Sequence, residues 1–294
     1  MPSLRELCAS GHQVVGVLTQ PAKPSGRNKV LTPTPVALVA QECGLKVFTP
    51  DTPEGIVEAV SSCSPDIGIV VAYGRILTDS VRSSVTLGWW NVHFSLLPRW
   101  RGAAPVPHAI EAGDTETGIT IFQIDGGLDT GPIALQQRFP IAAHDTTETL
   151  LGKLGKEAPT LVLRFLDDLV SGSTPLSPQV GEVSVAPIPS RLRGHISWSD
   201  NAAAIYRAFR AWSAEPGCFT KRSDSGQLIK IVDMAPLPEG PAMEPGRIRV
   251  DREGVLIGTA TTPLVLERVK PAGKSEMSAL DWVRGLPSGV VLGG

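Results

Sequence analysis

The sequence lacks the features that mark secreted, membrane-spanning and metal-binding proteins. Its four cysteines, Cys8, Cys43, Cys63 and Cys218, lie far apart and form no C-x-x-C pair, so neither a disulfide framework nor a zinc site is predicted. No stretch approaches the roughly 20 apolar residues of a membrane helix, and no apolar run near the N-terminus resembles a signal peptide. We therefore expect a cytoplasmic protein with reduced thiols, no metal ion and no membrane contact.

Charge is also scarce. Only 19% of the 294 residues are charged and the formal net charge is -2, which argues against a dedicated polyanion-binding protein. The charge is unevenly spread, because residues 1–189 carry 13 Lys and Arg against 18 Asp and Glu, whereas residues 190–294 carry 14 against 11. The mildly basic C-terminal third is compatible with a nucleic-acid contact.

Apolar residues are plentiful, at 42%, and a chain of this length can bury two cores. In the first half, β-branched strand-like runs alternate with helix-like segments, which predicts a Rossmann-like open, mostly parallel α/β sheet. The strand candidates are residues 12–20, 66–74, 89–97 and 118–125, and the helix candidates are residues 36–44, 54–63 and 146–172.

The N-terminus departs from this pattern. A doubly wound sheet usually opens with a strand, whereas residues 1–11 have the pattern of a helix. We therefore expect the sheet to lack its first strand, and the chain to be poorly stable unless upstream residues supply one, because each unpaired buried backbone group costs about 1–3 kcal/mol.

A Pro- and Ser-rich segment without periodicity divides the chain. Residues 1–172 are predicted to form the catalytic domain and residues 173–194 a linker. Short alternating strands dominate residues 195–294, which predicts a small OB-like β-barrel domain that could bind nucleic acid.

The segment NVHFSLLPRWRGAAP (91–105) is the first candidate for chemistry. Residues two apart in a strand share a face, so Asn91 and His93 project side by side near the end of the strand, where α/β sheets bind ligands. An amide donor and an imidazole that face one reacting atom can stabilise an oxyanion and move a proton. The alternative is that His93 is an ordinary core histidine.

The segment GGLDTG (126–131) supplies a candidate partner for His93. Glycines on both sides of Asp129 make a loop that can bring the carboxylate close to a ligand. Asp125 competes for this role, but its place at the end of a strand predicts that it caps the turn. An ordinary Asp-containing turn is the alternative.

The loop at residues 20–35 contains Lys23, Arg27 and Lys29 and no acidic residue. Such a long, Pro-rich loop after a strand is uncommon unless it is functional, and its three positive charges could contact a phosphate backbone. A solvated linker is the alternative that charge alone favours.

These segments together resemble the methionyl-tRNA formyltransferases, a branch of the folate-dependent formyltransferase superfamily. The resemblance runs from about residue 3 to about residue 285 and its motifs occur in family order. Asn-x-His and the Asp of Leu-Asp-Thr-Gly are shared by the whole superfamily. The basic loop, the SLLPRWRGAAP form and the PAGKSEM string at residues 271–277 point to the tRNA branch.

The resemblance implies 10-formyltetrahydrofolate as the formyl donor and initiator methionyl-tRNA as the acceptor, with the protein acting as a monomer. Asn91 and protonated His93 would donate hydrogen bonds to the oxyanion, while Asp129 holds the imidazolium. The folate would lie along Ser95, Leu96, Leu97 and Pro98, with its pterin against Val71, Ala72, Tyr73 and Gly74, and the tRNA would contact Lys23, Arg27 and Lys29.

Two rival functions remain open at this point. A sugar-nucleotide formyltransferase would use the same three residues but would make the basic loop and the barrel superfluous. A non-catalytic folate- or RNA-binding protein would bind a folate analogue without transferring a formyl group. The sequence also departs from the family at residues 189–198, where relatives tend to be rich in lysine and glutamate, so an RNA contact of the linker is less secure.

Overall fold

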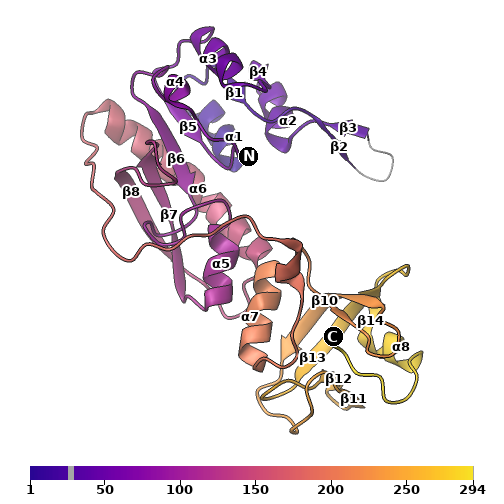
Figure 1. The fold of residues 1–294 in the computed structure, drawn as a ribbon. Helices are drawn as coiled ribbons and strands as arrows, with labels where there is room; N and C mark the ends of the chain where they lie inside the picture. Colours follow the sequence, from indigo (N-terminus) through magenta and orange to yellow (C-terminus); the bar gives the residue numbers. More distant parts are fainter. Residues whose placement is uncertain (26–29, 294) are drawn as a thin grey trace. The chain divides into compact units, whose positions relative to one another are not determined.

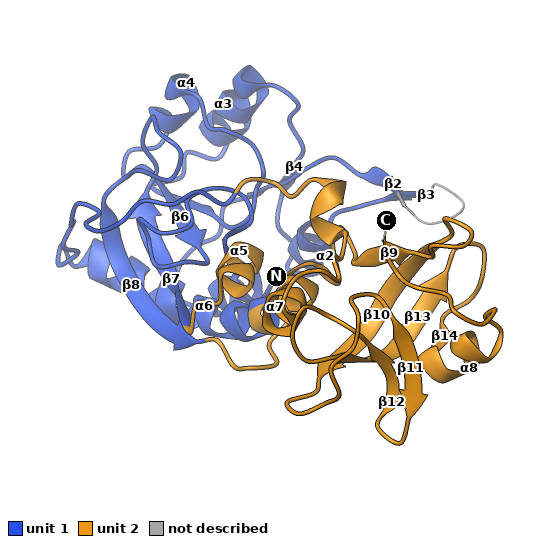
Figure 2. Cartoon of the chain, turned by 60° about the horizontal axis from the view of Figure 1, so that its bottom comes forward, with its two compact units in different colours: residues 1–105, 116–140, 151–186 blue, residues 106–115, 141–150, 187–294 orange. Residues whose placement is uncertain are grey.

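The computed structural model describes residues 1–25 and 30–293. Figure 1 shows the fold along the chain, and its contacts divide it into two compact units, which Figure 2 colours separately. Two short segments, residues 106–115 and 141–150, belong to the same unit as the C-terminal third. The domain boundaries predicted at residues 172 and 194 stay a prediction. Unit 1 comprises residues 1–105, 116–140 and 151–186, and unit 2 comprises residues 106–115, 141–150 and 187–294.

Two helices of unit 1 begin at a Thr-Pro step. α2 (Pro35–Glu42) follows Thr34 and α3 (Pro53–Ser61) follows Thr52, and each threonine hydroxyl accepts a hydrogen bond from a helix amide. The amide groups of the first helical turn have no carbonyl partner within the helix. Proline at the first position has no such N–H, and the threonine hydroxyl accepts a hydrogen bond from one of the remaining amides. Both helices were predicted, and both are confirmed.

The other N-terminal elements of unit 1 are short. β1 pairs with β4 in parallel, and β2 pairs with β3 as an antiparallel hairpin. These elements are α1 (Pro2–Ala9), β1 (Val17–Leu18), β2 (Lys23–Ser25), β3 (Val30–Thr32), β4 (Val47–Phe48) and α4 (Asp79–Arg82).

The main sheet of unit 1 has the strand order β5-β6-β7-β8. β5 and β6 run parallel, whereas β6 and β7, and β7 and β8, are antiparallel. The predicted open α/β fold is confirmed, and the sheet is mixed. The strands are β5 (Gly68–Val70), β6 (Trp89–His93), β7 (Glu116–Gln123) and β8 (Ile133–Pro140), and the long helix of this region is α6 (Thr147–Val170).

Helices cover both faces of β6. Trp89 and Trp90 are neighbours in the strand and therefore point to opposite faces. Trp89 packs in a buried cluster with Ile56 of α3 and Val81 of α4. The Trp90 ring lies 4.7 Å, centroid to centroid, from that of Phe165 in α6. Two-sided burial explains why the strand begins with two adjacent large apolar side chains instead of alternating apolar and polar ones.

Most of unit 2 is a small antiparallel barrel, as predicted (Figure 1). The strand order is β11-β12-β13-β10-β9, with β14 paired to β13. The C-terminal residues join the two edges, because Leu292 bridges Arg222 beside β9 and Val291 bridges Arg247 beside β11. This closure removes open strand edges. The elements are η1 (Arg191–Gly194), α7 (Ala202–Trp212), β9 (Phe219–Lys221), β10 (Leu228–Pro236), β11 (Ile248–Asp251), β12 (Gly254–Ile257), β13 (Leu264–Pro271), β14 (Met277–Ser278) and α8 (Ala279–Arg284).

Helix α5 (Pro105–Ala112) contributes to unit 2 through Glu111. One carboxylate oxygen of Glu111 accepts a hydrogen bond from the Trp212 indole at 2.8 Å, and the other pairs with Arg193 at 3.0 Å. The Glu111 carbonyl accepts a hydrogen bond from Arg207 at 3.2 Å. These contacts explain why residues 106–115 belong to the same unit as α7.

Candidate active site

Asn91 and His93 lie on one face of β6 at the end of the strand, as the strand period predicted. His93 is only 5% exposed, and its ring meets the Phe122 ring edge-on at 6.3 Å between centroids. Asn91 is partly exposed, and its side chain makes no hydrogen bond to any residue in the ranges 1–25 and 30–293. The Asn91 amide is thus available to a ligand.

The loop after β6 is organised by the buried hydroxyl of Thr120 in β7. This hydroxyl donates to the Ser95 carbonyl at 2.7 Å and accepts from the Gln136 amide at 2.9 Å. The same amide donates to the Leu97 carbonyl at 3.1 Å. The Ser95 hydroxyl is fully buried and donates to the Arg99 carbonyl at 2.6 Å. Side chains of β7 and β8 therefore fix the path of the loop.

The loop returns to His93 at Trp100. Trp100 has a φ of +64°, and its carbonyl oxygen lies 2.8 Å from His93 Nε2. A carbonyl can only accept, so Nε2 must carry a proton in this contact. In the neutral ring, Nδ1 therefore holds the lone pair.

Asp129 faces that second nitrogen. Its Oδ2 lies 3.7 Å from His93 Nδ1 and accepts a hydrogen bond from the Gly102 amide at 2.7 Å. Asp129 has a φ of +51°, which is uncommon for a residue other than glycine. Asp125 instead accepts hydrogen bonds from an amide and a hydroxyl of its own turn at 3.0 and 2.6 Å, so it caps the turn as predicted. The structure brings His93 and Asp129 together, and their catalytic role stays a prediction.

Burial controls the charge of His93. Desolvation lowers the pKa of His93 below its ordinary value of 6.5, while the Asp129 carboxylate and the Trp100 carbonyl act in the opposite direction. The net shift is downward, so the ring is mainly neutral near pH 7. A neutral ring whose Nδ1 faces Asp129 can accept a proton, and the carboxylate would then stabilise the imidazolium.

Two family models together match most of the chain. A model described as Formyl transferase matches residues 3–166, and one described as Formyl transferase, C-terminal domain matches residues 190–287. The chain belongs to the formyl transferase family. The resemblance carried by the sequence motifs is confirmed.

The relatives of this chain differ widely in sequence identity and in how much of each chain they cover. The methionyl-tRNA formyltransferase of Paenarthrobacter aurescens (strain TC1) is 42% identical over 291 residues, covering 97% of this chain and 93% of that protein. The structure of HypX from Aquifex aeolicus in complex with tetrahydrofolic acid has a TM-score of 0.64 at 20% identity, covering 83% of this chain but only 43% of that chain. The structure of WlaRD, a sugar 3N-formyl transferase, in the presence of dTDP and 5-N-formyl-THF has a TM-score of 0.67 at 18% identity, covering 93% and 94%. The two structural likenesses show the fold alone.

The four residues expected along the folate differ in exposure. Leu96 is partly exposed, whereas Ser95, Leu97 and Pro98 are buried. The Ser95 hydroxyl donates its hydrogen bond to the Arg99 carbonyl, so this side chain stabilises the loop. A folate contact of these residues stays a prediction.

Residues 71–74 follow β5 and adopt an irregular backbone. Ala72 and Gly74 have φ values of +50° and +74°, and Val71 is 38% exposed. The Tyr73 hydroxyl is buried and has no hydrogen-bond partner within the part of the chain that the structure describes. This segment therefore combines exposed backbone with a polar atom that a ligand could satisfy.

Of the three cations expected to contact tRNA, Arg27 and Lys29 lie outside the described residues. Lys23 is exposed in β2, opposite Thr32 of β3. Residues 20–35 were predicted as a loop, but within this range β2 and β3 pair as a short hairpin. A run as short as three residues has no periodicity that the sequence could reveal.

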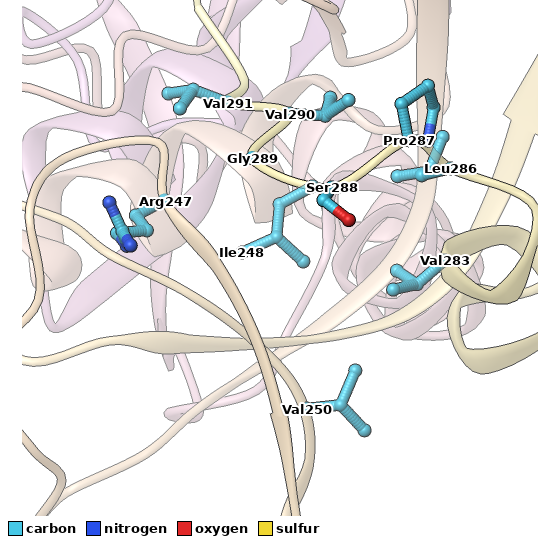
Figure 3. A pocket seen from close by; sticks show the side chains of 10 residues that line it. All are labelled: Arg247, Ile248, Val250, Val283, Leu286, Pro287, Ser288, Gly289, Val290 and Val291. Carbon is cyan, nitrogen blue, oxygen red and sulfur yellow. The ribbon is translucent and has the colours of Figure 1, made fainter.

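A pocket of about 270 Å³ lies in unit 2 (Figure 3). Its lining is mostly aliphatic, and none of the residues expected to act in catalysis, folate binding or tRNA binding lines it. The predicted active site is therefore distinct from this pocket. It is lined by Arg247, Ile248, Val250, Val283, Leu286, Pro287, Ser288, Gly289, Val290 and Val291.

Within residues 1–25 and 30–293, no three His, Cys, Asp or Glu side chains are grouped as a metal site requires. No helix in the same ranges is long and apolar enough to cross a membrane.

Three groups at the site were missed by the sequence analysis. The Trp100 carbonyl and the Gly102 amide contact the His93–Asp129 pair through the backbone, which leaves no mark on residue type. Gln179 donates to the Asp129 carbonyl at 2.8 Å from within the predicted linker. No periodicity or motif distinguishes it from its neighbours.

Proposed function

We propose that the chain transfers the formyl group of 10-formyltetrahydrofolate to the free amino group of methionine on initiator tRNA. The His93–Asp129 pair beside the free amide of Asn91 is the observation that carries this proposal. Bacterial relatives that cover nearly the whole chain are named methionyl-tRNA formyltransferase, which supports the acceptor.

The three side chains divide the work. As the methionyl amine attacks the formyl carbon, the carbonyl oxygen becomes an oxyanion, and the Asn91 amide donates a hydrogen bond to it. His93 Nδ1 takes the proton that the amine loses and returns it to the folate nitrogen as the bond between carbon and that nitrogen breaks. Asp129 stabilises the imidazolium between these two transfers.

The lowered pKa of His93 changes the role expected from the family resemblance. A ring that is mainly neutral before the substrates bind is a proton acceptor rather than a standing hydrogen-bond donor to the oxyanion. The ring becomes a donor only after it has taken the proton from the amine. His93 therefore acts first as a base and then as an acid.

The folate is a substrate, and two features support its expected place. The unsatisfied Tyr73 hydroxyl and the positive φ values at Ala72 and Gly74 suit a polar, planar ligand at residues 71–74. The Leu96 side chain and the backbone of residues 95–98 would line its path towards His93. Solved relatives in complex with tetrahydrofolic acid or in the presence of 5-N-formyl-THF support the ligand class.

The acceptor would be held by groups outside the catalytic loops. Lys23, Arg27 and Lys29 are proposed to contact the phosphate backbone. The barrel of residues 195–294 is proposed as a tRNA-binding domain joined through residues 173–194 to the catalytic domain of residues 1–172. The protein would act as a monomer in the cytoplasm, where charged tRNA is found.

The test is acceptor choice. Purified protein with 10-formyltetrahydrofolate should formylate charged initiator tRNA at least about tenfold faster than charged elongator methionine tRNA, a ratio worth about 1.4 kcal/mol. An amino sugar nucleotide serves as the rival acceptor. Formylation of the sugar but not of methionyl-tRNA would contradict the proposal, and binding of folate without transfer to any amine would indicate a non-catalytic protein.

A further inference from the structure

The connecting segment of residues 177–186, here called the strap, is anchored to the active-site loops of unit 1. At one end it exchanges two backbone hydrogen bonds with Ile133 of β8, at 2.8 and 2.9 Å. At the other end Ser184 accepts hydrogen bonds from the amides of Trp100 and Arg101, at 3.0 and 2.9 Å. The strap thus connects the loop after β6 with the strand after the Asp129 loop.

Between these two anchors, Gln179 links the loops through its side chain. Its Nε2 donates to the carbonyls of Asp129 and Gly131, each at 2.8 Å. Its Oε1 accepts from Nε and Nη2 of Arg101 at 3.1 and 2.7 Å. A glutamine amide offers two donors and two lone pairs, so each hydrogen-bonding position is used.

Both partners of Gln179 adjoin the groups that set the His93–Asp129 contact. Asp129 holds a left-handed backbone, which persists only where surrounding contacts enforce it. Arg101 immediately precedes Gly102, whose amide holds the Asp129 carboxylate at 2.7 Å. A shift of either loop would therefore change the separation of His93 Nδ1 and Asp129 Oδ2.

We infer that Gln179 is a positioning residue, which locks the Asp129 loop to the loop after β6 and thereby sets the geometry of proton transfer at His93. The inference rests on the proposed function. Gln179 acts through Asp129 and touches neither substrate, so its substitution should alter the transfer step more than binding.

Two substitutions separate the donor and acceptor roles. Gln179→Glu keeps the length and the acceptors for Arg101 but removes both donors and turns an anionic oxygen towards two carbonyls. Gln179→Leu removes all four hydrogen bonds. Gln227→Glu is the matched control, because Gln227 in unit 2 also donates to a carbonyl, that of Ala272, and accepts from an arginine, Arg222, both at 3.3 Å.

Both Gln179 variants should lower the rate constant for formyl transfer at saturation by roughly tenfold to a hundredfold, with KM for either substrate changed by less than about threefold. The Gln227→Glu protein should match the wild type. Circular dichroism melting checks the fold of each variant, and if one unfolds, the other decides the outcome. Unchanged transfer in a folded Gln179 variant overturns the inference.

Two further readouts distinguish positioning from general support of the fold. In NMR titration of labelled histidine, Gln179→Leu should lower the pKa of His93, since the Asp129 charge moves away. In an Asp129→Ala background, Gln179→Leu should cost less than about twofold more in rate, because the group it positions is gone. An unchanged His93 titration, or a full additional loss of rate, contradicts the inference. Failure of the wild type to formylate methionyl-tRNA would refute the proposed function, whereas the titration tests Gln179 independently.

Discussion

The loops around His93 and the hairpin that carries Lys23 belong to the same unit but are built in opposite ways. In the loops, backbone groups are held by side chains from other elements, as Thr120 holds Ser95 and Gln179 holds Asp129. In the described strands of the hairpin, β2 pairs with β3, and the side chains of the second strand, Val30–Thr32, are all exposed.

This difference agrees with the separate tasks that we propose for the two regions. Proton transfer needs atoms held within a fraction of an ångström, and cross-linked loops provide that. Recognition of a large acceptor needs side chains that protrude and carry charge. Substitutions in the loops should therefore change the rate of chemistry, and substitutions in the hairpin should change acceptor binding.

The largest effect is expected from the three catalytic candidates. Asn91→Ala, His93→Ala and Asp129→Ala should each lower turnover by at least about a hundredfold, because each removes a group that acts on charge developing in the transition state. Single-turnover formylation measures the loss, and circular dichroism melting shows whether the fold is kept.

The same loop supplies the control for this prediction. Asp125→Asn keeps a side-chain oxygen for the turn and should leave turnover within about threefold of the wild type. Near-normal turnover in the His93→Ala protein would remove the histidine from the mechanism, and an equal loss at Asp125 would mean that any change in the loop is harmful.

A smaller effect is expected from charge reversal in the basic segment. Arg27→Glu should raise KM for methionyl-tRNA by about tenfold and flatten its salt dependence, because a phosphate contact releases counterions when it forms. Transfer to a small amine acceptor should change little. Steady-state kinetics at several salt concentrations provide the measurement.

Arg164→Glu is the matched control for the total charge. Arg164 is exposed on α6 and pairs only weakly, at 3.8 Å, with Asp168. It should leave KM for tRNA unchanged. If Arg27→Glu impairs transfer to the small amine as much as transfer to tRNA, the segment supports the fold or the folate site instead.

The sequence predicted features that depend on local periodicity. The shared face of Asn91 and His93 follows from the strand period, and the choice of Asp129 over Asp125 follows from its flanking glycines. The barrel followed from closely spaced short strands. Each of these signals lies within one short segment.

The rest depends on pairings between distant segments. β8 was missed because half of its side chains are exposed and none is fully buried, so it lacks an apolar alternation. The strap was predicted to belong to a linker because residues 173–190 are rich in Pro and Ser and have no periodicity, although Gln179 contacts a residue 50 positions earlier in the chain. Such contacts depend on which loops meet in the fold, and the sequence of one loop does not reveal which other loop it will contact.

The smallest expected effect is a change of kcat with pH, which depends on His93 and leaves the hairpin unaltered. Since burial lowers the pKa of His93 below 6.5, kcat should be constant near pH 7 and fall with acidification through a pKa below 6.5, as the proton acceptor is lost. KM for tRNA should stay flat over this window, because the proposed phosphate contacts of the hairpin do not involve His93. For folding, the unfolded chain binds this proton more tightly, so the contribution of His93 to stability is present above pH 6.5 and falls as the pH drops below that value.

Asp129→Asn removes the charge that raises the pKa, so NMR titration of His93 should shift to still lower pH in that variant. A titration of His93 above 6.5 would reverse the assignment, because the ring would then be charged at the start of the reaction and would serve first as a donor to the oxyanion.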